Sequence, residues 1–213
     1  MRWSTNRGQN RFLSLFGLFL LVSSQPVFAL DSDTDGLPDE WEIANGRDPF
    51  NADYLVSLGG EHTCALDDNG AACWGHSVND RTMVPALINP SSITAGENHT
   101  CALDDSGALC WGRNEAGQTS VPFLSNPSQV SAGGDHTCAI DDTGVICWGD
   151  NRKREITVPA LSDPYFVVAG GDHTCALDDS GAVCWGDNVF GQATVPVLAN
   201  PKQLSAGNDH TCA

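Results

Sequence analysis

The tetrapeptide His-Thr-Cys-Ala occurs five times in this chain of 213 residues, and each copy starts 37 residues after the one before. Its histidines are His62, His99, His136, His173 and His210. Other markers keep the same step, among them Cys-Trp-Gly, Val-Pro and Ala-Gly, and no complete copy has gained or lost a residue. A period of this length indicates that one supersecondary unit is copied and stacked into an array.

Each unit has the pattern of a β-hairpin, as residues 101–112 show. Two short apolar runs flank an Asp-Asp-x-Gly turn, in which Asp and Ser accept local hydrogen bonds and Gly supplies a positive φ. Runs of about four residues have the length of strands rather than of helices. A third strand is expected before the hairpin, at residues 129–132 and their copies, and the Asn126-Pro127 and Asp163-Pro164 pairs mark the crossings between units.

These features predict an all-β fold, because small sheets repeated without helices most often arrange as blades around an axis. A β-propeller is therefore the expected architecture. The alternative is a β-solenoid, but solenoid coils usually have shorter periods and parallel ladders, which the hairpin turns disfavour.

The string Ala-Gly-x-x-His-Thr-Cys-Ala-Leu-Asp-Asp-x-Gly-x-x-Cys-Trp-Gly resembles the repeat of the regulator of chromosome condensation family, in the compact, disulfide-containing form of secreted bacterial proteins. The resemblance covers about residues 55–213 and implies a seven-bladed propeller. The nearest functional analogue with blades this short is the second type of beta-lactamase inhibitory protein, whereas the eukaryotic namesake exchanges nucleotide on a small GTPase and contacts chromatin. Since the fifth copy stops at Cys212 and Ala213, we expect a truncated fifth repeat and a fragment of a longer propeller.

The amino terminus predicts export. Arg2, Arg7 and Arg11 precede an apolar run at residues 12–22, and residues 27–29 (Val-Phe-Ala) offer the small residues of a signal-peptidase site. The run is too short for a comfortable membrane span, and no later segment provides one. Removing residues 1–29 as a signal peptide takes away three arginines and no acids, which moves the formal charge from −17 to −20. Such an acidic chain repels phosphate backbones, so no nucleic-acid partner is expected.

Eight of the nine cysteines form four pairs, each bracketing one hairpin: Cys64 with Cys73, Cys101 with Cys110, Cys138 with Cys147, and Cys175 with Cys184. In an exported chain they are predicted to form cross-strand disulfides, with Cys212 left unpaired. Zinc is the competing interpretation, because each unit holds one His and two Cys. It is disfavoured because no fourth ligand is available.

Residues 30–54 carry a predicted calcium loop. Oxygen ligands fall at loop positions 1, 3, 5, 9 and 12, a backbone carbonyl falls at position 7, and Gly36 allows the sharp turn. The predicted ligands are Asp31, Asp33, Asp35, the Leu37 carbonyl, Asp39 and Glu42. The segment also resembles the calcium-binding repeats of thrombospondin type 3. An acidic solvated linker is the plainer alternative.

The array shows no catalytic constellation, and we expect no enzyme. A catalytic residue is needed once, whereas the histidines and the Cys-Trp-Gly tryptophans recur in every complete unit and are predicted to serve the fold. The sequence therefore predicts a secreted or surface-displayed protein-binding module. The alternatives are part of a secreted hydrolase or lyase, with its active site on the propeller face or in a missing domain, and, third, guanine-nucleotide exchange.

The predicted docking face is built from the loops between Trp-Gly and Val-Pro. These loops, at residues 76–82, 113–119, 150–156 and 187–193, keep their length while their content changes. Repeat architecture places equivalent loops on one face, and such loops commonly carry binding. Solvent loops without function are the plainer alternative. The residues expected to contact a partner are Arg113, Arg152, Lys153, Arg154 and Phe190.

Overall fold

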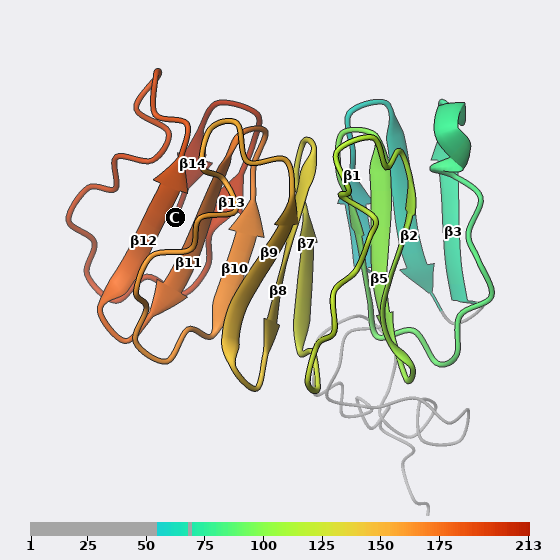
Figure 1. Ribbon diagram of the computed structural model, residues 1–213, viewed down its shortest axis with the longest axis horizontal. Coiled ribbons are helices and arrows are strands. Elements are labelled where there is room, and N and C mark those ends of the chain that lie inside the picture. Colours follow the sequence, from blue (N-terminus) through green and yellow to red (C-terminus); the bar gives the residue numbers. More distant parts are fainter. Residues whose placement is uncertain (1–54, 68–69) are drawn as a thin grey trace, which may run out of the picture.

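A computed structural model describes residues 55–67 and 70–213, which form a row of small antiparallel sheets (Figure 1). Each complete sheet takes three consecutive strands in chain order. The strands are β1 (Leu55–Leu58), β2 (His62–Asp67) and β3 (Gly70–Gly75); β4 (Ser92–Ala95), β5 (His99–Asp104) and β6 (Gly107–Gly112); β7 (Gln129–Ala132), β8 (His136–Asp141) and β9 (Gly144–Gly149); and β10 (Phe166–Ala169), β11 (His173–Asp178) and β12 (Gly181–Gly186). A two-stranded sheet of β13 (Ser205–Ala206) and β14 (Thr211–Cys212) follows, and one short 3-10 helix, η1 (Val78–Asp80), lies after β3.

The predicted hairpins and the strand before each hairpin are confirmed in all four complete units. In the third unit the register pairs Thr137 with Trp148 and Cys138 with Cys147. The turn is closed by Asp141, whose Oδ1 accepts hydrogen bonds from the backbone N and the hydroxyl of Thr143, both at 2.7 Å. Gly144 then takes a φ of 116°, a conformation that favours glycine.

The register places the two sulfurs of each unit opposite each other, and all four expected disulfides are present. They join Cys64 to Cys73, Cys101 to Cys110, Cys138 to Cys147, and Cys175 to Cys184. Cys212 is the one free cysteine of the described residues, and it is exposed. Because both thiols of each pair are bonded to each other, they cannot ligate zinc. A disulfide across so short a loop contributes on the order of 2 kcal/mol in the chain-entropy model.

The first disulfide shows the surroundings that all four share. Its partners Cys64 of β2 and Cys73 of β3 lie opposite each other in the register, as predicted. Cys64 is fully buried, whereas Cys73 is only partly buried and packs at the margin of the cluster that contains Leu66 and Ile93. The prediction that both cysteines serve the fold is confirmed by the bond between them.

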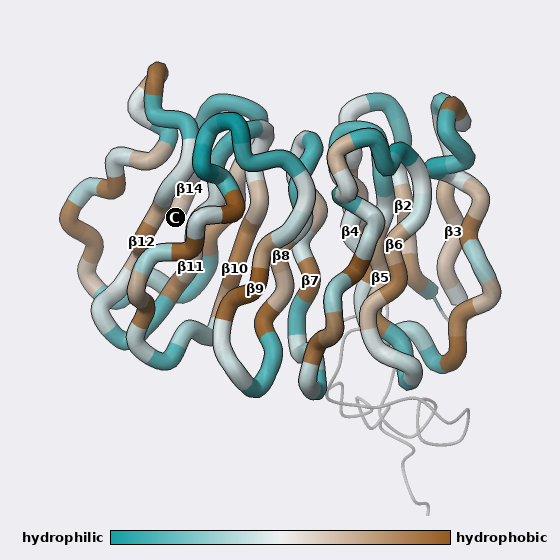
Figure 2. The backbone as a smooth tube through the Cα atoms, viewed as in Figure 1, coloured by the Kyte–Doolittle hydropathy of each residue, from teal (hydrophilic) through white to brown (hydrophobic). Residues whose placement is uncertain are grey.

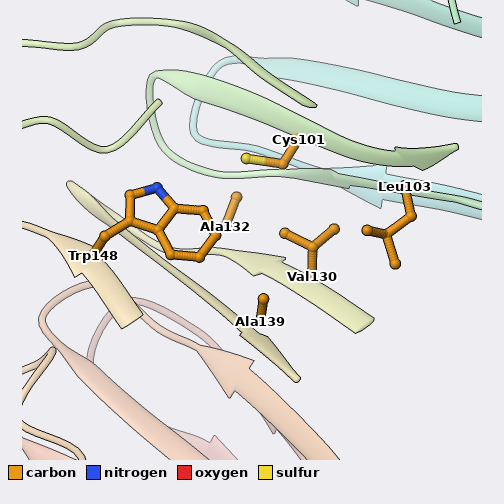
Figure 3. Close-up of a cluster of buried hydrophobic side chains, with 6 residues drawn as sticks. All are labelled: Cys101, Leu103, Val130, Ala132, Ala139 and Trp148. Carbon is orange, nitrogen blue, oxygen red and sulfur yellow. The ribbon is translucent and has the colours of Figure 1, made fainter. Parts of the chain in front are cut away.

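The hydrophobic core is divided into thin layers between neighbouring sheets. Figure 3 shows one layer, in which Cys101 and Leu103 of β5 face Val130 and Ala132 of β7, with Ala139 and Trp148 completing the cluster. The first strands of successive sheets also contact one another, β1 with β4, β4 with β7 and β7 with β10. The sheets therefore stack through their first strands, as the blades of a propeller do.

A polar clamp joins each unit to the next. His136 Nε2 lies 2.9 Å from Thr174 Oγ1 of the following unit, and that hydroxyl donates to the carbonyl of Glu155 at 2.9 Å. Because the hydroxyl hydrogen is used on the carbonyl, the imidazole must donate from Nε2. The same His–Thr contact recurs for His62, His99 and His173.

Burial keeps the imidazoles of the clamp neutral. His99 and His136 are fully buried, and their Nδ1 atoms have no hydrogen-bond partner among the described residues. Burial, together with the neighbouring histidines, lowers the pKa of His99 to about 3 and that of His136 to about 4. The prediction that the repeated histidines serve the fold is confirmed by this geometry.

The glycine before each clamp is fixed by the close approach of neighbouring atoms. A Cβ on Gly133 would lie within 3.0 Å of the Gly170 carbonyl oxygen of the next unit and of the His136 ring. Any larger residue would push neighbouring sheets apart, which explains why glycine stands at this position in each described unit.

No helix among residues 55–67 and 70–213 is long and apolar enough to cross a membrane. The predicted signal peptide and the predicted calcium loop lie outside the described residues.

Candidate partner-binding face

The four variable loops lie at one end of the stacked sheets, as predicted. Each loop begins beside the turn that precedes the second strand of its own unit: the backbone N of Arg113 donates to the Asn98 carbonyl at 3.0 Å, and that of Asp150 donates to the Asp135 carbonyl at 2.9 Å. The Asp-Asp turns lie at the other end of the hairpins, six residues of strand away. Figure 2 shows the loop end as predominantly hydrophilic.

The last three loops share an internal frame. Asn114, Asn151 and Asn188 each use Oδ1 to accept a hydrogen bond from the backbone N five residues later, at 3.0, 3.3 and 3.0 Å. A buried Gln or Glu at the base of each loop accepts a second bond, from the backbone N two residues earlier. These base residues are Gln118, Glu155 and Gln192. The frame holds the backbone, so the exposed tips can differ without changing the fold.

The base position was missed by sequence reasoning. Its four occupants, Arg81, Gln118, Glu155 and Gln192, are at most 5% exposed, although none is apolar. Their carbonyls accept the clamp hydroxyls, and those of the first three also accept a tryptophan N–H. The sequence signal for this position is its 37-residue spacing. That signal is hard to recognise because the side chain differs between units.

Arg81 shows how the first loop differs. Its guanidinium, 1% exposed, donates to Asn98 Oδ1 at 2.6 Å and to Glu61 Oε2 at 3.0 Å. At the corresponding position of the third loop, burial raises the pKa of Glu155, with the charges of Asp150 and Asp172 acting in the same direction.

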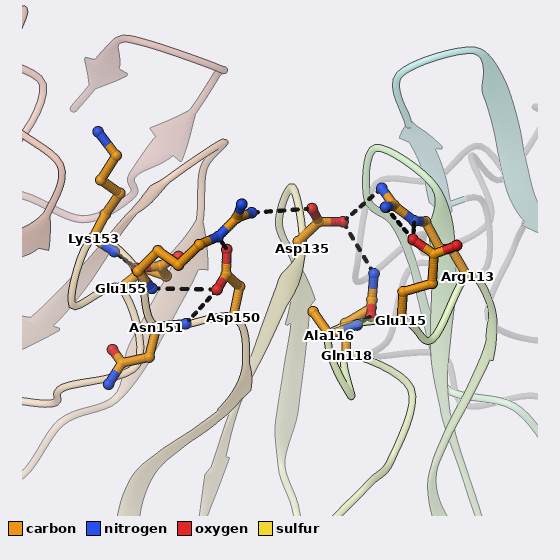
Figure 4. A network of polar contacts seen from close by, with 10 residues as sticks. Arg113, Glu115, Ala116, Gln118, Asp135, Asp150, Asn151, Lys153 and Glu155 are labelled. Atoms are coloured by element: carbon orange, nitrogen blue, oxygen red, sulfur yellow. Dashed lines mark hydrogen bonds and ion pairs between the residues drawn. The ribbon is translucent and has the colours of Figure 1, made fainter.

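The predicted basic residues come together, but each of three is paired with an acid. Figure 4 shows the pairs of the two arginines. Asp135 lies between two loops, 3.4 Å from Arg113 and 3.9 Å from Arg152. Arg152 also bonds Asp150 at 2.5 Å, and Lys153 reaches Asp187 of the next unit at 3.5 Å. The side chain of Arg152 is 77% exposed, so solvent weakens these pairs strongly. They orient neighbouring loops rather than leave a free positive cluster.

Arg154 and Phe190 occupy exposed loop tips. Arg154 adopts a φ of 68°, in the left-handed region. Phe190 is 73% exposed beside Val189, which is 72% exposed, while its backbone N is held by Gln192 Oε1 at 2.9 Å. An apolar pair on a fixed backbone loses little conformational entropy when a partner covers it.

No group of three or more His, Cys, Asp or Glu side chains suited to a metal ion occurs in the part of the chain that the structure describes. This face combines ordered loops, paired charges and an exposed apolar tip.

The sequence model of the family described as "Regulator of chromosome condensation (RCC1) repeat" matches residues 91–118, 128–154 and 166–192. No curated protein sequence matches the chain. Among solved structures, the CRINKLY WD40 ectodomain of the Arabidopsis thaliana receptor kinase ACR4 is 30% identical, with a TM-score of 0.60 over 75% of this chain and 60% of that one. The ectodomain of the Physcomitrella patens receptor kinase CR4 is 29% identical, with a TM-score of 0.60 over 73% and 45%.

Prp20p from Saccharomyces cerevisiae is 21% identical, with a TM-score of 0.61 over 73% of this chain and 53% of that one, and shows the fold alone. The chain thus spans 45% to 60% of the length of these three structures. The match of the family model and the repeated three-stranded sheets show that this chain contains regulator of chromosome condensation repeats, folded as in propellers of that type.

Proposed function

We propose that this chain is an exported protein-binding module whose partner docks on the variable-loop face. The observation that carries the proposal is the common frame of the last three loops, which presents different exposed side chains at the same place in successive units. Structural similarity to Prp20p, whose structure is described together with its binding to Gsp1p and histones, supports protein binding by this fold. The four disulfides support an oxidising compartment.

In this proposal Phe190 and Val189 act as the apolar anchor, while Arg113, Arg152, Lys153 and Arg154 supply the surrounding polar contacts. Anchors of this kind often dominate binding energy, whereas exposed ion pairs contribute little to it. The ion pairs through Asp135 and Asp187 hold the loops in place before the partner arrives.

The test starts from a partner captured by the full chain from the surroundings of the producing cells. Phe190→Ala is expected to weaken that partner's affinity by about tenfold or more, because truncating an anchor residue costs about 2 kcal/mol or more. The triple variant Arg152→Ser, Lys153→Ser, Arg154→Ser should mainly slow association. Titration calorimetry or surface plasmon resonance measures both effects.

The matched control is Phe123→Ala. Phe123 is 92% exposed and lies beside Asp104 and Asp105 of an Asp-Asp turn, at the opposite end of the sheets from Phe190. It should leave affinity unchanged. If Phe123→Ala abolishes binding and Phe190→Ala does not, the docking face is the Asp-Asp turn end.

Calcium binding by residues 31–42 is a separate proposal, supported by the ligand spacing alone. Titration of the full chain is expected to show one calcium site in the micromolar to millimolar range. Glu42→Gln, which removes the proposed bidentate ligand, should abolish the site, whereas Glu40→Gln, at a non-ligand position of the same loop, should not. Equal effects of the two variants, or no heat at millimolar calcium, would reduce the segment to an acidic linker.

A further inference from the structure

The third variable loop has a carboxyl group where the loops on either side of it have an amide. In the second loop, Gln118 Oε1 accepts the backbone N–H of Ala116 at 2.9 Å, and Gln118 Nε2 donates to Asp135 Oδ1 at 3.0 Å. The fourth loop repeats this arrangement with Gln192. Its Oε1 also accepts a backbone N–H, and its Nε2 donates to Asp187 Oδ2 at 3.1 Å. In both loops the amide at the base therefore donates to a carboxylate.

Glu155 occupies the same base position of the third loop. Its Oε2 accepts the backbone N–H of Lys153 at 2.7 Å, as the glutamine oxygens do in their own loops (Figure 4). Its Oε1 takes the place of the glutamine NH₂ group, although the oxygen of an ionised carboxylate has no hydrogen to donate. Glu155 is 1% exposed, so bulk solvent does not reach this oxygen.

Both kinds of carboxylate that the glutamines use have counterparts around Glu155. Asp172, in the turn before β11, lies 37 residues after Asp135. Asp150, directly after β9, lies 37 residues before Asp187. Burial raises the pKa of Glu155, and the charges of Asp150 and Asp172 act in the same direction. The third loop thus brings a buried carboxyl group close to two further acids.

The basic side chains of the third loop do not neutralise Glu155. Arg152 Nε binds Asp150 at 2.5 Å, and Lys153 Nζ binds an acid of the fourth loop at 3.5 Å. Within residues 55–67 and 70–213, no basic side chain forms an ion pair with Glu155. Asp150 also accepts the backbone N–H groups of the two residues that follow it, so Asp172 is the acid left to receive a hydrogen bond from Glu155.

The elements around Glu155 bring both charged and titratable groups. Burial lowers the pKa of the imidazole that follows Asp172, so this group is neutral at pH 7. The groups on these elements are Asp150, Arg152, Lys153 and Arg154 after β9, Asp172 and His173 at the start of β11, and Asp187 after β12.

We propose that Glu155 carries a proton and donates it from Oε1 to Asp172, so that a hydrogen bond between two carboxyl groups joins the third loop to the fourth unit. A protonated carboxyl group has one O–H donor and one acceptor oxygen, the same two functions that the Gln118 amide uses. When the pair loses this proton, two negative charges face each other and the bridge between the units is broken. The docking face that contains this loop is therefore sensitive to rising pH.

The sign of the pH dependence follows from the raised pKa of Glu155. The unfolded chain binds this proton with the ordinary value of 4.5, whereas the folded chain keeps the proton to higher pH. The stability that the bridge contributes is fully present below pH 4.5 and is lost as the pH rises through the folded pKa. The buried histidines act in the opposite direction, so the bridge has to be isolated by comparing variants.

The first test compares the wild-type chain with Glu155→Gln, which has a permanent N–H donor and does not titrate. Urea unfolding of the oxidised full chains between pH 4.5 and pH 8 gives the folding equilibrium constant of each. The ratio of variant to wild type is expected to rise with pH, by up to about tenfold per pH unit, until the wild-type carboxyl group ionises. The histidine contribution cancels in this ratio. A ratio that stays constant over the whole range would overturn the proposal.

Asp172→Asn tests the identity of the acceptor. The new amide donates to an ionised Glu155, so in this background the effect of Glu155→Gln should lose most of its pH dependence. Glu115→Gln is the matched control, because the Glu115 side chain lies in the second loop and is 77% exposed. Its ratio to wild type should stay constant above pH 4.5. An undiminished pH dependence in the Asp172→Asn chain would show that Asp172 does not receive the proton.

NMR titration of the side-chain carboxyl carbons in the full chain gives a measurement that does not depend on unfolding. One glutamate signal is expected to titrate at higher pH than the others and to be missing from the spectrum of Glu155→Gln. The absence of such a signal would overturn the proposal. These experiments need no partner, so they test the bridge independently of the proposed docking role of the face.

Discussion

Acidification from pH 7 to pH 5 is expected to cost the fold about 2 kcal/mol for each of the buried histidines His99 and His136. Both imidazoles are fully buried, and burial with their histidine neighbours lowers their pKa values from 6.5 to about 3 and about 4. The unfolded chain therefore binds more protons than the folded chain below pH 6.5. The stability that depends on neutral imidazoles is fully present above pH 6.5 and is lost as the pH falls towards the folded values.

Denaturant unfolding of the oxidised chain at several pH values between 7 and 4.5 measures this loss. The aspartates of the hairpin turns act in a separate window, because hydrogen bonds from Thr143 and Ser180 lower the pKa values of Asp141 and Asp178 below 3.8. His136→Gln keeps a side-chain N–H for Thr174 and cannot titrate, so its slope should be shallower by up to about 1.4 kcal/mol per pH unit. A wild-type stability that stays constant down to pH 5 would show that burial does not keep these imidazoles neutral in the folded chain.

The array itself was predictable because the same weak secondary-structure signal recurs at the same position in every unit. One copy of the hairpin gives a weak signal, but four complete copies in register fix the strand pairs, the Asp-Asp-x-Gly turn and the cysteine bridges. The role of Gly133 was less accessible, since its constraint comes from the Gly170 carbonyl of the next unit rather than from its own turn. Contacts between units do not appear in the pattern of any single unit.

The position of the candidate site was predictable from the sequence, but the ion pairing of its basic residues was not. Equal loop lengths placed the four loops on one face, whereas the pairing of Arg113 and Arg152 with Asp135 joins residues from different units. The sequence shows residues 152–154 as a run of three positive charges, but two of them, Arg152 and Lys153, are paired with acids. The buried base position was also hidden, because Arg81, Gln118 and Glu155 share a place in the fold and no chemical property that a pattern would display.

Trp148→Ala is expected to destabilise the chain by about 3–5 kcal/mol, the range for truncating a buried aromatic side chain. Trp148 is 8% exposed and packs with Leu103, Val130 and Ala139 between two sheets. Its Nε1 also donates to the buried Gln118 carbonyl at 2.9 Å, so the substitution removes a hydrogen bond as well as a filled volume. Thermal and denaturant unfolding of the oxidised chain measure the effect.

Trp74 provides the matched control, because it has the same position in the third strand of the first unit but is 54% exposed. Trp74→Ala should cost well under half as much, since most of its ring is already in water and little cavity is created. The difference in destabilisation between the two variants measures how much free energy one tryptophan contributes by packing against a preceding unit. Equal costs would mean that the tryptophan stabilises its own hairpin, and that the layers between sheets contribute less than their burial indicates.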